Sequence, residues 1–158
     1  AGQLLGAMLG ALLAWAAFKQ LFDANNLDEA GNETGANAST GGIFFTGPAH
    51  PNNFWNAVTE FIGTCVLLMF IAFGPSGGEI GALKYFAVAF VVVSVGLSLG
   101  TPTGYAINPV RDLGPRLMYA FVLPIKDKGS ANWGYAWVPI VAPLLAAVAI
   151  GFLSMALA

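Results

Sequence analysis

The sequence predicts an all-α membrane protein, a bundle of transmembrane helices with one re-entrant half-helix. Composition is the first reason: of the 158 residues, 57% are apolar and only 9% are charged, whereas a soluble domain normally carries about 25% charged residues. The second reason is that the apolar residues gather in runs of about 20, the length of helix that crosses a bilayer. The net charge of -2 is small and no basic run is present, so nucleic acid is not an expected partner.

The first apolar run, residues 1–22, is expected to be a transmembrane helix. Gly2, Gly6 and Gly10 recur at every fourth position, which places them on one helix face where a second helix could approach closely. The chain opens inside this run without a signal-peptide pattern, and we expect it to be a fragment. Residues 23–53 follow as a long polar loop, whose two Asn-x-Ser/Thr sequons leave glycosylation open.

The second run, residues 54–73, is also expected to span the membrane, and it contains Glu60. A carboxylate at this depth is costly unless it faces the protein interior and has a partner. The expected partners are backbone N–H groups of the irregular stretch 101–107, because unpaired backbone groups in a membrane need acceptors. The alternative is an exposed Glu60 at the membrane interface.

A short helix is expected after Asn108, and it is too short to cross the membrane. Asn is a favoured N-cap and Pro suits the first helical position, so Asn108 and Pro109 mark a helix start. About 14 residues remain before the next polar link, or roughly 21 Å of helix against an apolar core of about 30 Å. Pro102 and Gly104 interrupt the preceding run. We therefore expect residues 101–123 to form a re-entrant loop and half-helix.

Two further transmembrane helices are expected on either side of this stretch, over residues 83–100 and 135–157. The later one begins among aromatic residues, Trp133, Tyr135 and Trp137, which are typical of a membrane–water interface.

The stretch GYAINPVRDLGPR, residues 104–116, resembles the second pore motif of the major intrinsic protein family of water channels and glycerol facilitators. Asn-Pro-x-Arg-Asp between a span and a half-helix is specific, whereas Asn-Pro alone would be weak. The similarity runs from the third transmembrane helix of that family to the end of the sixth. It implies that residues 1–158 are a single, incomplete channel domain with an aquaporin-like fold. The missing N-terminal half of the pore, with its own Asn-Pro-Ala motif, is the partner that the resemblance implies.

The resemblance also assigns roles to residues. The pore motif is Asn108, Pro109 and Val110, with Val110 in place of the usual Ala. The selectivity filter is Gly96, Tyr105 and Arg111. Backbone carbonyls line the pore at Thr103, Gly104, Tyr105, Ala106 and Ile107. Structural support comes from Glu60, Asp112 and Arg116.

The function that the resemblance implies is a passive channel of the facilitator subgroup, which conducts glycerol, other small neutral solutes and water. Tyr105 stands where facilitators usually have Phe, and Gly96 stands where water-selective channels usually have His. Arg111 is permanently charged and has five N–H donors, so it can bind two hydroxyl oxygens at once. Its charge and the positive helix N-terminus both repel cations, a general property of aquaporin-type pores. The alternative for Arg111 is a snorkelling residue or an ion pair with Asp112.

Two other functions stay open: a water-selective aquaporin, and a structural membrane protein without transport. An enzyme is not expected, because no catalytic residues stand out. The single His50 lies in the polar loop without a second ligand at metal-binding spacing, so neither a metal nor another cofactor is predicted. The resemblance further implies a homotetramer in the plasma membrane, surrounded by lipid.

Overall fold

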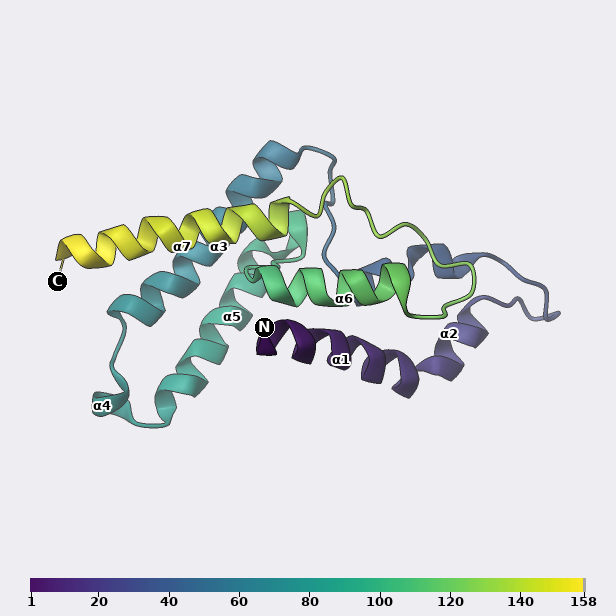
Figure 1. The fold of residues 1–158 in the computed structure, drawn as a ribbon, viewed down its shortest axis with the longest axis horizontal. Helices are drawn as coiled ribbons and strands as arrows, with labels where there is room; N and C mark the ends of the chain where they lie inside the picture. Colours follow the sequence, from purple (N-terminus) through teal and green to yellow (C-terminus); the bar gives the residue numbers. More distant parts are fainter. Residues whose placement is uncertain (158) are drawn as a thin grey trace. The chain divides into compact units, whose positions relative to one another are not determined.

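The computed structural model describes residues 1–157, in which every regular element is a helix. This confirms the predicted all-α class. The chain divides into two compact units, whose helices are labelled in Figure 1. Residues 1–46 and 110–136 form the first, here called the half-helix unit. Residues 47–109 and the segment from Trp137 onward form the second, here called the spanning unit.

The spanning unit contains the longest helices. They are α3 (Asn53–Phe73), α5 (Leu83–Thr103) and α7 (Val138–Leu157), with the short α4 (Gly77–Ile80) between the first two. The three long helices have 21, 21 and 20 residues and are apolar enough to cross a membrane. Within the unit, α3 packs against both α5 and α7. The side chain of Asn52 caps α3 by accepting a hydrogen bond from the Trp55 N–H at 3.3 Å, as expected for an Asn N-cap.

α5 continues past Gly100, where we expected the helix to end, so Pro102 lies inside its last turn. A proline removes one helical hydrogen bond and crowds the preceding turn, but only one further helical residue follows this one. The Pro102 carbonyl instead accepts a hydrogen bond from the Ala49 N–H at 2.9 Å. Gly104 then ends the helix in the left-handed conformation, at φ 80°, which glycine adopts without steric cost.

The half-helix unit contains four elements: α1 (Gly2–Ala17), α2 (Lys19–Asn25), the 3-10 helix η1 (Ala36–Ile43) and α6 (Pro109–Phe121), which begins at the boundary between the units. We expected one helix over residues 1–22, but a bend of 64° separates α1 from α2. The bend places Phe22 in the aromatic core of the unit, where its ring stacks on Phe44 with centroids 5.8 Å apart. The partner of Phe22 thus comes from a distant loop.

That loop is more ordered than its polar composition indicates, since η1 lies within residues 23–53. Asn37, in one of the two sequons, is 1% exposed. Its side-chain amide donates to the carbonyls of Phe22 and Lys126, both at 3.0 Å. Asn37 is therefore a structural residue and is not available to carry a glycan.

α1 approaches α6 closely at Gly114. A Cβ atom added to Gly114 would lie 2.8 Å from the Ala7 Cβ, so the two helices meet through small residues. The glycine row noted in the sequence, Gly2, Gly6 and Gly10, does not take part in this contact. Among the described residues, no atom of another segment lies within 4 Å of a Cβ built on Gly2, Gly6 or Gly10, so this row makes no close contact with another described helix.

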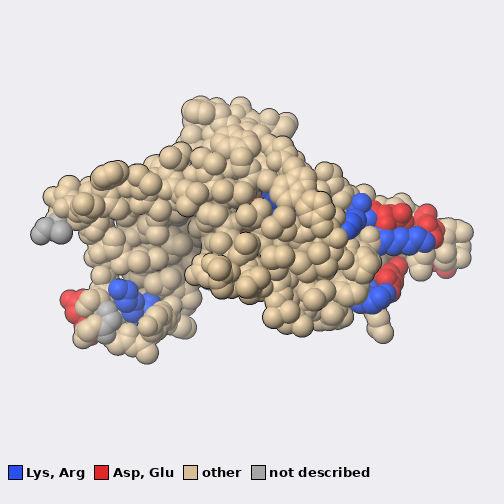
Figure 2. All heavy atoms as spheres, viewed as in Figure 1, with Lys and Arg blue, Asp and Glu red and all other residues tan. Residues whose placement is uncertain are grey.

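Charged side chains occur in small groups with uncharged surface between them, as Figure 2 shows for one face. Two of these groups belong to the half-helix unit, where Lys19 pairs with Asp23 and Lys126 pairs with Glu33. All four side chains are more than half exposed. Exposed pairs of this kind contribute little to stability.

Candidate pore site

Glu60 of α3 holds the loop that precedes the half-helix. Its side chain is 1% exposed. One carboxylate oxygen accepts from the Ala106 N–H at 2.9 Å and the other accepts from the Ile107 N–H at 2.8 Å. The structure thus pairs the buried carboxylate with two N–H groups of residues 101–107, the stretch that was predicted to supply its partners. Such charge-assisted bonds are about twice as strong as neutral ones.

The same loop has an unusual backbone conformation. Tyr105 and Ile107 have φ angles of 42° and 41°, in the left-handed region that costs a non-glycine residue about 1–2 kcal/mol. The two bonds to Glu60 offset this strain. Because the N–H and C=O of a trans peptide point in opposite directions, the carbonyls of Tyr105 and Ala106 point away from Glu60. The loop therefore presents a carbonyl row on the side opposite the carboxylate.

The ring of Tyr105 lies against α5 at two glycines. A Cβ on Gly96 would lie 3.0 Å from the ring Cζ, and a Cβ on Gly100 would lie 2.9 Å from Cδ1. Any side chain at either position would displace the ring. Tyr105 as a whole is 40% exposed. Two predicted filter residues, Gly96 and Tyr105, are thus in contact. Gly100 was missed by sequence reasoning, although its spacing of four residues from Gly96 was a usable signal.

The remaining pore-lining and motif residues take different positions. Thr103 is fully buried at the end of α5, and its hydroxyl oxygen accepts from the Tyr105 N–H at 3.3 Å. Asn108 is exposed and directly precedes α6, while Pro109 and Val110 form its first turn and are half-buried. α6 has 13 residues, or about 20 Å of helix, which is shorter than the apolar core of a bilayer.

Arg111, the third predicted filter residue, belongs to the half-helix unit. It is exposed, and its Nη1 donates to the Phe44 carbonyl at 3.4 Å. An ion pair between Arg111 and Asp112 was one of the alternatives that the sequence left open. The structure pairs Asp112 with Arg116 instead, one helical turn further on, through Arg116 Nε and Asp112 Oδ1 at 2.7 Å. Both members of this pair are fully buried.

Arg116 connects three segments of the half-helix unit. Besides Asp112, its guanidinium donates to the carbonyls of Thr46 at 2.9 Å and Ala131 at 2.6 Å. Its Cζ also lies 4.2 Å from the centre of the Phe45 ring, in a cation–π arrangement. The partners on the loop, Phe44, Phe45 and Thr46, were not predicted, because no local pattern relates them to residues 66–71 positions away.

The far end of the half-helix is capped by another residue that sequence reasoning missed. The ammonium of Lys128 donates to the carbonyls of Tyr119 at 2.6 Å and Leu123 at 2.7 Å. A cation at a helix C-terminus also interacts favourably with the helix dipole. Burial lowers the pKa of the Lys128 ammonium, which is consistent with a side chain folded onto the protein.

Comparison with known families decides which protein family this is. The sequence model of the family described as "Major intrinsic protein" matches residues 1–154. The chain belongs to the major intrinsic protein family. Membership confirms the family resemblance and the aquaporin-like helical fold, and with the three long apolar helices it makes the chain an integral membrane protein.

Similar members of the family are named as glycerol channels. A "Glycerol uptake facilitator protein" of Streptococcus pneumoniae is 44% identical over 146 residues, which is 92% of this chain and 58% of that protein. The Bacillus subtilis protein of the same name is 44% identical over 92% of this chain and 49% of its own length. "Aquaglyceroporin-3" of Trypanosoma brucei brucei is 37% identical, over 94% of this chain and 49% of its own length. The chain thus spans about half the length of these relatives.

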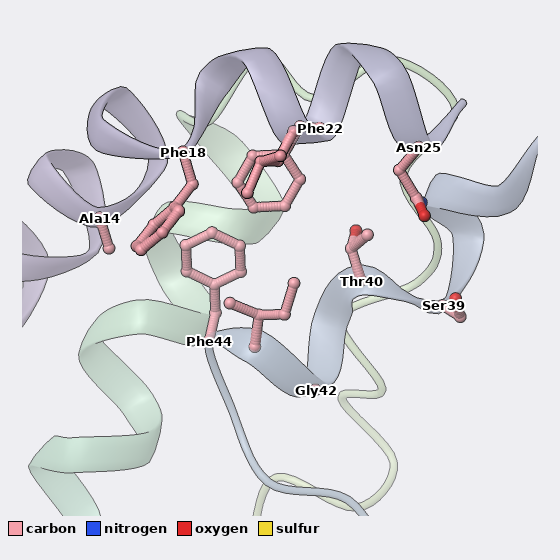
Figure 3. A pocket seen from close by; sticks show the side chains of 10 residues that line it. Ala14, Phe18, Phe22, Asn25, Ser39, Thr40, Gly42 and Phe44 are labelled. Atoms are coloured by element: carbon pink, nitrogen blue, oxygen red, sulfur yellow. The ribbon is translucent and has the colours of Figure 1, made fainter. Parts of the chain in front are cut away.

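An open pocket lies beside the loop that contacts Arg111. Its volume is about 540 Å³, and Figure 3 shows the aromatic rings of Phe18, Phe22 and Phe44 at one end and polar side chains at the other. The lining residues are Ala14, Phe18, Leu21, Phe22, Asn25, Ser39, Thr40, Gly42, Ile43 and Phe44. Among the residues that the structure describes, none closes this side of the loop.

Among the described residues, no group of three or more His, Cys, Asp or Glu side chains could hold a metal ion. The ionisable groups of the site are instead bonded to backbone groups or to each other. Glu60 accepts from two N–H groups and Asp112 from Arg116 and Thr46. This arrangement fixes backbone positions rather than preparing a group for acid–base chemistry.

Proposed function

We propose that the chain contributes half of a passive channel for glycerol and other small neutral solutes, with water as a second permeant. The observation that carries the proposal is the loop held by Glu60, which turns the carbonyls of Tyr105 and Ala106 away from the carboxylate. A row of carbonyls opposite an apolar wall suits a polyol, whose hydroxyls need acceptors and whose carbon chain does not. The names of the relatives support the same solute class.

Each predicted filter residue has a role in this proposal. The ring of Tyr105 forms the apolar wall for the carbon chain, and Gly96 leaves the space in which that ring lies. The guanidinium of Arg111 donates to the hydroxyls and repels cations. The Asn108 side chain offers its amide to the permeant at the start of the half-helix. A His at position 96 would displace the ring, which favours a glycerol channel over a water-selective one.

A complete pore requires a second half-helix, in line with the inverted repeats of many transporters and channels. We therefore propose that the chain acts together with a companion segment that carries the other Asn-Pro motif. We also propose a homotetramer in the plasma membrane, in which each complete channel conducts independently. No bond making or breaking is involved, since the pore residues only bind and release the solute.

Solute flux in proteoliposomes tests this proposal. The complete channel is reconstituted, and vesicle volume is followed by light scattering after an osmotic step with glycerol or with an impermeant solute. We expect glycerol permeability well above that of protein-free vesicles made from the same lipid. Water flux without glycerol flux would indicate a water-selective pore, and neither flux would indicate a structural protein. Either result would overturn the proposal.

A further inference from the structure

Ile107 has a bulky side chain at a position whose backbone favours glycine. Its φ angle of 41° is rare for a β-branched residue, whereas a glycine adopts such an angle without steric cost. The bond to Glu60 uses only the N–H group of Ile107, which any residue except proline could supply. The side chain therefore contributes something to the loop that a glycine would not.

This side chain lies against α3 at Gly63, in what is here called the Gly63 recess. A Cβ atom built on Gly63 would lie 3.2 Å from Ile107 Cγ2 and 3.2 Å from Val95 Cγ1. The next atom, Leu99 Cδ1, would be 3.8 Å away. The two shorter distances are below normal carbon–carbon contact, so the recess exists because residue 63 has no side chain. Gly63 is buried, and Val95 and Ile107 are only 2% and 8% exposed.

Glu60 and Gly63 are three residues apart on α3 and so share one face of the helix. Glu60 holds the backbone of the loop through the N–H groups of Ala106 and Ile107. Gly63 leaves room for the Ile107 side chain. Two attachments at different points along α3 fix the rotation of the loop as well as its position. They also fix how far from α3 the carbonyls of Tyr105 and Ala106 lie.

The other left-handed residue of the loop is placed in the same way. Tyr105, at φ 42°, has its ring against Gly96 and Gly100 of α5. Both strained residues thus put their side chains where a helix has none, and these apolar contacts offset the cost of the backbone conformation. The two glycine contacts differ in position. The contact at Gly96 involves predicted filter residues, whereas the Gly63 recess lies on the side of the loop that faces Glu60.

We infer that Gly63 is a positioning residue of the pore loop: the recess it leaves on α3 receives the Ile107 side chain and sets the distance between α3 and the carbonyls of Tyr105 and Ala106. The inference rests on the proposed function, because this distance affects transport only in a channel. Gly63 itself does not touch the solute. A side chain at position 63 pushes the loop away from α3 and toward the solute, and a narrower path hinders glycerol more than the smaller water molecule.

Gly63→Ala tests the inference, with Gly151→Ala on α7 as the matched control. Both variants replace a helical glycine by alanine and gain the same helix propensity, but nothing lies within 4 Å of a Cβ built on Gly151. Fluxes are measured with the complete channel in proteoliposomes. We expect Gly63→Ala alone to lower the ratio of glycerol to water permeability several-fold. An unchanged ratio, or an equal fall in Gly151→Ala, would overturn the inference.

Hydrogen exchange at the loop amides reports the same strain without any transport. The amide protons of Ala106 and Ile107 exchange when their bonds to Glu60 open, and this opening also moves the Ile107 side chain away from residue 63. The strain caused by an added methyl group is released on opening. We therefore expect exchange about ten-fold faster in Gly63→Ala than in the parent, read by mass spectrometry of the peptide that carries the loop. Equal rates would contradict the inference.

The Ile107 side chain supplies a second pair of variants, which decides the question if Gly63→Ala does not assemble. Ile107→Ala empties the recess, and Ile150→Ala removes an isoleucine of α7 that is equally buried, at 8% exposure. We expect faster exchange of the Ala106 amide in Ile107→Ala only. Ile107→Val keeps methyl groups on Cβ and should recover most of the lost protection. Equal exchange in the two alanine variants, or no recovery with valine, would overturn the inference.

The two measurements separate failure of the inference from failure of the proposed function. A parent protein without glycerol flux would remove the proposed function but leave the exchange comparison intact. Equal exchange rates in a conducting channel would remove the inference alone.

Discussion

Two buried carboxylates, Glu60 and Asp112, hold the backbone before and after Asn108. They differ in the groups that donate hydrogen bonds to them. Glu60, in the spanning unit, accepts from the backbone N–H groups of Ala106 and Ile107. Asp112, in the half-helix unit, pairs with the guanidinium of Arg116 and also accepts from Thr46. The first arrangement shapes one short loop. The second ties three segments together.

The difference decides what each carboxylate is needed for. Removing Glu60 would leave two neutral N–H groups and a strained loop, whereas removing Asp112 would leave a fully buried guanidinium without its counter-charge. A buried unpaired charge costs far more than a buried neutral donor. We therefore expect the half-helix unit to depend on its carboxylate for folding, and the spanning unit to depend on its carboxylate mainly for the shape of the pore loop.

The largest effect is expected for Asp112→Ala. It should lower the free energy of unfolding by about 3–5 kcal/mol, the usual cost of breaking a buried ion pair from one side. The measurement is the yield and the unfolding midpoint of the purified protein in detergent. The double variant Asp112→Ala, Arg116→Met removes both charges and should recover part of the loss. A single variant as stable as the parent would mean that the pair is not a folding requirement.

A smaller effect is expected for Glu60→Gln, which keeps the shape of the side chain. The amide can accept through its oxygen only, so one of the two N–H groups loses its partner, at a cost of about 1–3 kcal/mol. Glycerol and water flux should both fall at matched protein density, because the loop relaxes from its left-handed conformation. Glu33→Gln, at an exposed carboxylate paired with Lys126, is the matched control. Equal flux in the parent and Glu60→Gln would show that the loop holds its shape without the charge.

The sharpest change in selectivity, at a cost in stability no larger than that of Glu60→Gln, is expected for Gly96→Ala. The new Cβ lies 3.0 Å from the Tyr105 ring, so the ring must shift, at a cost of about 1–3 kcal/mol. Glycerol permeability should fall more than water permeability, because the wall for the carbon chain has moved. Gly151→Ala, where nothing lies within 4 Å of the new Cβ, should leave the ratio unchanged. If both variants have the parental ratio, the ring of Tyr105 does not set selectivity.

The parts of the structure that follow from local rules could be predicted from the sequence. The burial of Glu60 and its bonds to backbone N–H groups follow from the cost of leaving either unpaired in a membrane. The half-helix after Asn108 follows from capping preference and length. The spacing of Asp112 and Arg116, four residues apart on a helix, was also a usable signal for an ion pair.

The remaining features depend on contacts that no short pattern encodes. The bend at Phe18 accompanies the stacking of Phe22 on Phe44, and the order of η1 depends on the buried Asn37 amide reaching Lys126, 89 positions away. Thr46 could not be singled out, because a lone threonine in a polar loop resembles any other. Its importance appears only once the fold has placed a buried ion pair against it.

The left-handed backbone at Tyr105 and Ile107 has a consequence for the order in which the protein forms. These conformations are unfavourable on their own, so the loop adopts them only after its acceptor is present. Glu60 precedes Ala106 by 46 residues, and α3 is therefore synthesised before the loop that needs it. The pore loop therefore forms only once α3 is in place, and the amide protons of Ala106 and Ile107 should begin to resist exchange only when their bonds to Glu60 have formed.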